Sequence, residues 1–279
     1  MKILFLGDIV GDSGCIAVKK NLQTIIEKNK INFVIANGEN AAIDGVGITE
    51  NNVKELISSG VDVITTGNHV WDQKETFEFI KKEKRLLRPE NLLNDVPGSG
   101  FEVYMSKKGL RVGVLNLMGN VFMKKCKDVF EVTKNFIDNH KLKKNYDFLV
   151  VDFHGEITSE KMAMGHYLDG HATIVVGTHT HVPTNDARIL ENGTAYLTDA
   201  GMCGDYDSVI GMNKQNSINR FFKRDSQKHF PAKGEATLCG MIVNADENNG
   251  LAKSISSFIY GGKLTCLLYT SDAADDSRS

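Results

Sequence analysis

The sequence predicts an α/β fold built around a largely parallel sheet, and two patterns carry that prediction. Short runs rich in β-branched residues recur along the chain, and most are apolar throughout rather than alternating with polar residues. Such runs are typical of strands that are buried on both faces. Stretches with apolar residues at helical spacing separate them, and strand–helix alternation is characteristic of parallel sheets.

Five runs, each bounded by Gly, Asn or Asp, are expected to form the parallel-type strands. In chain order they are "KILFLGD" (2–8), "FVIANGE" (33–39), "VDVITTGNH" (61–69), "FLVVDFH" (148–154) and "ATIVVGTHTH" (172–181).

Helices are expected between the early strands. Their apolar faces include Ile16, Leu22, Ile25 and Ile26, then Val53, Leu56 and Ile57, and then Phe77 and Ile80. Gly60 follows the second helix as a C-cap, because glycine readily adopts the left-handed conformation that ends a helix. Asp72 and Glu75 have the spacing of a capping box ahead of the third helix.

The pattern changes after residue 100, where antiparallel strands are expected. Residues 101–117 form two strands around a Lys-Lys-Gly turn, and 193–201 and 236–260 contain further strands, the latter with an Asn-Asn-Gly turn. A second sheet packed on the first accommodates them. Since no linker rich in Pro, Gly or Ser divides the chain, we expect one domain over residues 1–264.

Composition narrows the function classes. The chain has 279 residues, 41% of them hydrophobic, and a formal net charge of −2, which excludes a general electrostatic attraction to nucleic acid or membrane surfaces. The five cysteines are widely spaced and form no C-x-x-C, as expected in a reducing cytoplasm without a disulfide framework. No apolar run approaches the ~18 residues of a membrane span, and Asp8 interrupts the N-terminal run too early for a signal peptide.

The last residues look foreign to the domain. "CLLYTSDAADD" (266–276) resembles the translated transposase end-sequence used in sequencing libraries, in which case the native chain stops near Leu264. The alternative is a polar, disordered tail. Residues 265–279 are therefore expected to be non-native or disordered.

All five parallel-type runs end in side chains that can bind metals. The run ends supply Asp8, then Glu39 and Asn40, then Asn68 and His69, then His154, and last His179 and His181. Because ligands of open α/β sheets bind beyond the carboxyl ends of the strands, these residues are expected to converge. Oxygen and imidazole donors without cysteine suit Fe, Mn or Zn.

Each of these residues also has an ordinary structural interpretation. Asp8 can form a turn, Glu39 and Asn40 can cap the next segment, and His154 can be a satisfied core histidine. The pair His179 and His181 is more specific, because positions i and i+2 of an extended segment point to the same side. Taken together, with four of the eight histidines at strand ends, they favour a metal centre.

The ordered blocks "GD", "GEN", "GNH", "H" and "GTHTH" resemble those of the calcineurin-like metallophosphoesterases, whose usual signature is D-x-H, G-D, G-N-H, H and G-H-x-H. The resemblance extends to about residue 260. "GDIVG" lacks the His of D-x-H, and Glu39 stands where most members have Asp. With "NGENAA", "GNHVWD" and "DFHGEITSEK", both departures resemble one bacterial branch that hydrolyses 2′,3′-cyclic nucleotides.

The resemblance implies a four-layer α/β/β/α sandwich of two mixed sheets and a dinuclear phosphodiesterase. It implies that Glu39 bridges two metal ions, iron or manganese, whose hydroxide attacks the phosphorus while His69 protonates the leaving oxygen. The first metal ion would be held by Asp8, Asn40 and His181, and the second by Asn68, His154 and His179. Asp72 or another carboxylate is a candidate to orient His69, and members of the branch often form oligomers.

Other interpretations stay open at this stage. A phosphomonoesterase or nuclease would use the same chemistry, although no long basic and aromatic groove for nucleic acid is visible. A metal-bound regulatory protein with weak turnover is a third possibility. Trp71 either packs in the core or walls the pocket. Residues 204–235 form either a substrate-side flap containing Arg220 or a surface connection or oligomer contact, with the latter preferred.

Overall fold

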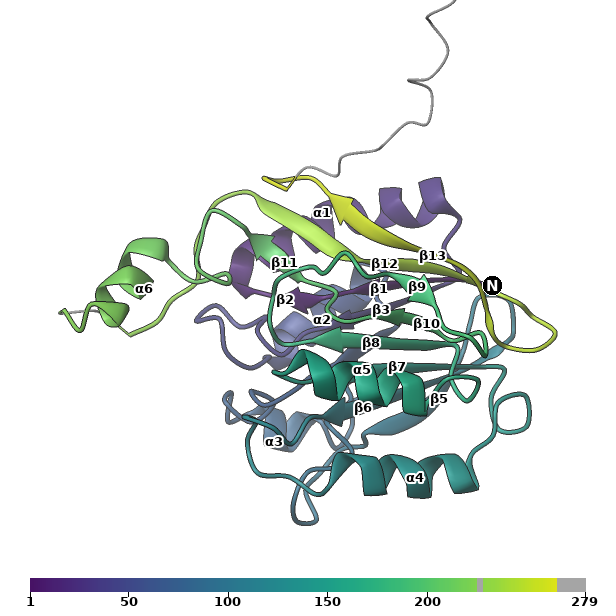
Figure 1. Ribbon diagram of the computed structural model, residues 1–279. Helices are drawn as coiled ribbons and strands as arrows, with labels where there is room; N and C mark the ends of the chain where they lie inside the picture. Colours follow the sequence, from purple (N-terminus) through teal and green to yellow (C-terminus); the bar gives the residue numbers. More distant parts are fainter. Residues whose placement is uncertain (225–227, 265–279) are drawn as a thin grey trace, which may run out of the picture.

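The computed structural model describes residues 1–224 and 228–264 as two sheets packed face to face with helices outside (Figure 1). The first sheet has the order β2-β11-β12-β1-β3-β4, with β13 paired to β12, and the second has the order β5-β6-β7-β8-β10-β9. The expected tail at 265–279 lies outside the described residues.

The strands of the first sheet are β1 (Lys2–Leu6), β2 (Asp8–Ile9), β3 (Phe33–Asn37), β4 (Val63–Thr65), β11 (Met202–Asp205), β12 (Ala236–Ala245) and β13 (Ala252–Tyr260). Those of the second are β5 (Phe101–Met105), β6 (Arg111–Met118), β7 (Phe148–His154), β8 (Ile174–Thr178), β9 (Arg188–Ile189) and β10 (Ala195–Leu197). The helices are α1 (Gly11–Asn29), α2 (Glu50–Ser58), α3 (Thr76–Phe79), α4 (Val129–Asn139), α5 (Thr158–Tyr167) and α6 (Lys214–Phe221).

Alternation along β1 shows how the layers are built. Ile3 and Phe5 point into a core between the two sheets, shared with Val150 of β7 and Val176 of β8. Leu4 and Leu6 point the other way, into a core with α1 and α2. A third core joins the second sheet to α4 and α5. The expected four-layer α/β/β/α sandwich is confirmed, and both sheets are mixed, since each combines parallel and antiparallel pairs.

One organisational expectation was wrong: the five parallel-type strands do not share a sheet. β1, β3 and β4 pair in the first sheet, whereas β7 and β8 pair in the second. The hairpins at 101–117 and 236–260 are antiparallel as expected. β10, however, is parallel to β8 and antiparallel only to β9. Strand residues buried on both faces do not record which neighbour they pair with, so the run itself could not distinguish these arrangements.

Two helix details also differ from expectation. Ile16 of α1 is 61% exposed, while Leu22, Ile25 and Ile26 are buried, so the apolar face is narrower than the sequence suggested. Asp72 does not cap α3, because the Asp72 carboxylate contacts His69 instead. The N-cap residue of α3 is Glu75, whose side chain makes no cap hydrogen bond. Gly60, at a φ of 111°, does follow the last turn of α2 as expected.

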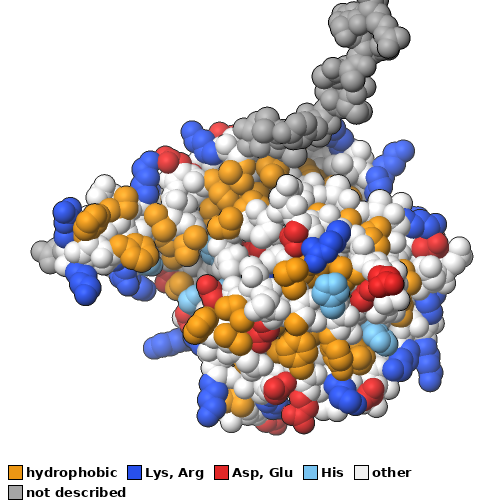
Figure 2. Space-filling model, viewed as in Figure 1, with side chains coloured by type: hydrophobic (Ala, Val, Ile, Leu, Met, Phe, Trp, Pro, Cys, Tyr) orange, Lys and Arg blue, Asp and Glu red, His pale blue; other side chains and the backbone are white. Residues whose placement is uncertain are grey.

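Within the segment 204–235, α6 projects from the body (Figure 1). Its tip carries apolar side chains in the open, with Phe221 85% and Phe222 64% exposed (Figure 2), and Arg220 is exposed as well. The exposed tip suits a surface connection, whereas the base of the segment reaches His181, whose Nδ1 lies 2.8 Å from Ile210 O. Among the described residues, no helix is both long and apolar enough to span a bilayer.

Candidate metal centre

Strand ends from both sheets bring the eight predicted site residues to one region. Asp8 opens β2, Glu39 and Asn40 follow β3, Asn68 and His69 follow β4, His154 ends β7, and His179 and His181 follow β8. The two sheets face each other across a common core, so their carboxyl ends meet. Asp8, Glu39 and His154 are completely buried.

Glu39, His154 and His179 form the tightest group, with one ligand atom of each lying within 4.8 Å of the others. The Nε2 atom of His154 lies 3.0 Å from Glu39 Oε1 and 3.1 Å from His179 Nδ1. The same nitrogen lies 3.1 Å from Asn68 Oδ1. One imidazole nitrogen thus faces three potential ligands at once, an arrangement that suits a shared cation.

A second group lies beside the first. Asn40 Nδ2 is 3.1 Å from His181 Nε2, and Asp8 Oδ1 is 3.7 Å from the same ring nitrogen. Asn40 Nδ2 also donates to Glu39 Oε1 at 3.4 Å. The backbone N–H of His179 donates to Asp8 Oδ2 at 3.1 Å. Glu39 therefore contacts members of both groups.

The "H-T-H" segment reaches the site through an unusual backbone. His179 has a φ of 98° and His181 a φ of 64°, values that L-residues seldom adopt and that concentrate at functional sites. Asp199 holds the segment, because its Oδ2 atom accepts from Thr180 N at 3.1 Å and Thr180 Oγ1 at 2.7 Å. Lys161 of α5 pairs with that oxygen at 2.7 Å, fully buried.

The buried carboxylates Asp8 and Glu39 are compensated by neighbouring histidine rings. Burial alone would raise the pKa of the Asp8 carboxyl, but His181 and His154 lower it overall. Burial opposes protonation of His181, yet the adjacent Asp8 raises the pKa of this ring to about 9. Among the described residues, the groups in ion-pair contact with Asp8 and Glu39 are histidine rings. Two buried carboxylates therefore attract positive charge here, as protons or as metal ions.

The donor set fits a metal centre. Asp8 Oδ1 is buried and has no hydrogen-bond partner among the described residues, and an unsatisfied buried carboxylate oxygen is costly unless a cation or water meets it. The surrounding donors are carboxylate, amide and imidazole groups, which suit iron, manganese or zinc. Metal ions would displace the protons that the histidines otherwise hold.

Several supporting residues were not anticipated from the sequence. His154 Nδ1 contacts Thr178 Oγ1 at 2.9 Å, and Thr178 donates to buried Asp152 at 2.7 Å. Glu156 Oε2 lies 3.0 Å from His179 Nε2. Carboxylates that do not bind the metal themselves commonly orient metal-binding imidazoles in this way. Acidic residues in "VDFHGE" next to a candidate ligand were the signal that could have indicated them.

His69 lies at the rim rather than among the donors. Its backbone N–H donates to Glu39 Oε2 at 3.1 Å, and its Nδ1 lies 2.6 Å from Asp72 Oδ2. Lys124 approaches from a loop of the second sheet, with Nζ contacting Asn68 O and lying 3.4 Å from Asp72 Oδ1. Asp72 is therefore the carboxylate that orients His69.

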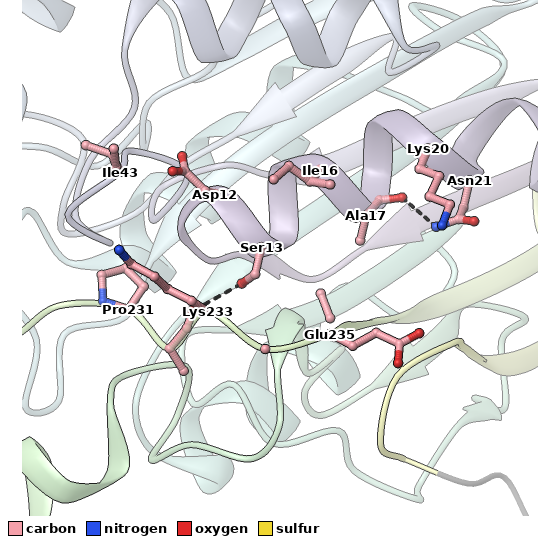
Figure 3. A pocket seen from close by; sticks show the side chains of 13 residues that line it. Asp12, Ser13, Ile16, Ala17, Lys20, Asn21, Ile43, Pro231, Lys233 and Glu235 are labelled. Atoms are coloured by element: carbon pink, nitrogen blue, oxygen red, sulfur yellow. Dashed lines mark hydrogen bonds between the residues drawn. The ribbon is translucent and has the colours of Figure 1, made fainter.

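A separate cavity of about 530 Å³ lies between α1 and residues 231–236. Figure 3 shows Asp12, Ile16 and Lys20 on one wall and Pro231 and Lys233 on the other. Asp8, Glu39 and the other predicted site residues do not line this cavity. The cavity is therefore separate from the donor cluster.

The sequence matches a known protein family over most of its length. The model of the YmdB-like protein family matches residues 4–258. The chain belongs to the YmdB-like family. A curated relative from Bacillus subtilis, named 2′,3′-cyclic-nucleotide 2′-phosphodiesterase, is 43% identical over 259 residues, covering 93% of this chain and 97% of the relative.

Two solved structures share the four-layer fold of this chain. A hypothetical protein from Thermus thermophilus superimposes with a TM-score of 0.86 at 37% identity, over 93% of this chain and 99% of the other. A Mycoplasma pneumoniae protein described as a novel phosphatase superimposes with a TM-score of 0.85 at 36% identity, over 93% of each chain. Both comparisons cover most of the four-layer sandwich.

Proposed function

We propose that the chain is a dinuclear, metal-dependent phosphodiesterase that hydrolyses 2′,3′-cyclic nucleotides. The observation that carries the proposal is the position of Glu39, whose Oε1 lies 3.0 Å from His154 of one donor group and 3.4 Å from Asn40 of the other. A carboxylate between two donor groups suits a pair of cations. The Bacillus subtilis relative, at 43% identity, carries the name of this activity.

The proposed ligand sets follow the two groups of contacts. Glu39 would bridge both ions, Asp8, Asn40 and His181 would hold one, and Asn68, His154 and His179 would hold the other. Contacts of about 3 Å within each set support this division. The two sets draw on five separate strand ends in two sheets, so the site forms only in the folded chain. The shared core supports a single domain over residues 1–264.

The chemistry divides between the ions and the chain. Two bound cations would make a water molecule acidic and neutralise charge on the phosphoryl group. As water adds to phosphorus, the bond from phosphorus to one ribose oxygen breaks, and that oxygen takes a proton. We assign this proton to His69. Asp72 holds the Nδ1 side of the ring at 2.6 Å, which leaves Nε2 free to donate.

The experiment that tests the proposal is a substrate panel. The purified chain, loaded with Mn²⁺ or Fe²⁺, is assayed with 2′,3′-cyclic AMP, 3′,5′-cyclic AMP, a phosphomonoester and RNA. We expect kcat/KM to be highest for 2′,3′-cyclic AMP by at least about tenfold, and chelation to abolish turnover. Preference for the monoester or RNA would contradict the proposal in favour of a related hydrolase. Metal binding without turnover would indicate a regulatory protein.

A further inference from the structure

We propose that the cavity beside Asn68 is the subsite for the nucleobase. Its volume is about 320 Å³ and its walls include Trp71, Leu92, Leu93, Val96, Met118 and Lys124. This size lies within the roughly 300–1,000 Å³ range of small-molecule sites. The inference rests on the proposed function, because it assigns the part of a cyclic nucleotide that does not react.

The cavity lies on the side of the site where the leaving ribose oxygen would be. Hydrolysis of the cyclic phosphate forms a bond from water oxygen to phosphorus and breaks one from phosphorus to ribose oxygen, which receives the proton. The ribose, and the base attached to it, therefore lie on the side of the proton donor. Lys124, which lines the cavity, contacts Asp72 at 3.4 Å, and Asp72 holds His69. The cavity thus opens beside the acid.

The walls match a nucleobase chemically. Trp71 packs against the first core and edge-on against Phe77 and also lines this cavity, where an aromatic ring offers a surface on which a base can stack. Leu92, Leu93 and Val96 supply apolar walls. Lys124 and Lys125 contribute ammonium groups, of which that of Lys124 already contacts Asn68 O and Asp72 Oδ1. No acidic side chain among the described residues lines this cavity. All four common bases carry acceptor atoms on their edges. By contrast, the cavity in Figure 3 is lined by Asp12 and Glu235 and by none of the predicted site residues.

Trp71 supplies a direct measurement, because it is the single tryptophan of the chain. Fluorescence excited at about 295 nm, where tyrosine and adenine contribute little, would report on Trp71 at the wall of this cavity. The Mn²⁺-loaded protein is titrated with adenosine 3′-monophosphate and, separately, with 1-O-methylribose 3-phosphate, in which a methoxy group replaces the base. We expect a saturable change with the first compound only. No change with either, or equal changes with both, would overturn the subsite.

A variant tests the same point through kinetics. Leu93 is 37% exposed at the cavity, and Leu93→Trp would fill part of it. We expect the ratio of kcat/KM for 2′,3′-cyclic AMP to that for 1-O-methylribose 2,3-cyclic phosphate to fall by about tenfold. The matched control is Val103→Trp, since Val103 is 40% exposed on β5 and does not line the cavity. Its ratio should equal that of the wild type.

The outcomes separate this inference from the proposed function. If the wild type hydrolyses both cyclic phosphates with equal kcat/KM, the base subsite is overturned and the phosphodiesterase activity stands. If it hydrolyses neither, the proposed function is overturned, and the subsite with it. A ratio that is unchanged in Leu93→Trp, with the protein folded by circular dichroism, would also overturn the subsite.

Discussion

At Gly67, the missing side chain is what allows Glu39 and His154 to approach each other. A Cβ atom at this position would lie 2.2 Å from His154 Cδ2 and 2.4 Å from Glu39 Oε2, far inside van der Waals contact. Both neighbours are fully buried and cannot swing away without breaking other contacts. The glycine of "GNH" is therefore a requirement of the site rather than of the turn.

We expect Gly67→Ala to reduce metal affinity and turnover by at least about 100-fold, because the added methyl group separates Glu39 from His154. Metal content after gel filtration and kcat/KM with 2′,3′-cyclic AMP provide the measurement. Gly204→Ala is the control, since its nearest atom would be 3.3 Å away, at Val10. Full metal occupancy in Gly67→Ala would contradict the geometry.

His69 and Glu39 differ in what each should contribute. We expect His69→Ala to retain metal and lose about 10²–10⁴-fold in kcat, the usual contribution of general acid catalysis. Glu39→Ala should lose both metal and activity. Metal analysis combined with kinetics of each variant distinguishes the two roles. Full activity in His69→Ala would exclude this residue as the acid.

Among the elements, β6 and β7 are joined at their starts by one charged pair. Asp147, just before β7, accepts from Arg111 N at 2.8 Å and from its Nε and Nη2 atoms at 3.3 and 3.2 Å. The Arg111 side chain lowers the pKa of the Asp147 carboxyl from 3.8 to about 2. The contact supports the parallel register that brings His154 to the strand end.

We expect Asp147→Asn to lower the free energy of unfolding by about 1 kcal/mol at neutral pH, a modest value because the pair is partly screened by solvent. The folded pKa is below the unfolded one, so this stabilisation is present above about pH 4 and is lost as pH falls towards 2. Urea titrations at several pH values measure it, with exposed Asp95→Asn as the control. A difference that grew on acidification would contradict the assignment.

On the scale of the whole molecule, the proposed site is a junction between two sheets. β1 and β3 approach it from one sheet and β7 and β8 from the other, held together by the core that contains Phe5, Val150 and Val176. Because the donors are dispersed when the chain unfolds, metal ions should bind the native state far better than the unfolded one. Metal binding and folding are then linked.

We therefore expect metal removal to lower thermal stability. Manganese at about 100 times its Kd should add about 2.7 kcal/mol to the free energy of unfolding, or roughly 5–10 °C in Tm for a chain of this size. Thermal unfolding with Mn²⁺ and with a chelator provides the comparison. The same addition should leave Glu39→Ala unchanged, and an equal gain in that variant would place the binding site elsewhere.

The sequence by itself determined the identity of the buried strands and the donors that end them, because strand length, β-branched content and terminal polar residues are local properties. Runs such as 148–154 and 172–181 contain β7 and β8, and the ends of the five runs supply all eight predicted site residues. The tertiary structure alone decided that the strands divide between two sheets, that Asp72 serves His69 rather than α3, and that Gly67 must lack a side chain. These features depend on contacts such as His179 with Asp8, 171 positions apart, and hydrophobic patterning specifies that a face is buried without specifying what covers it.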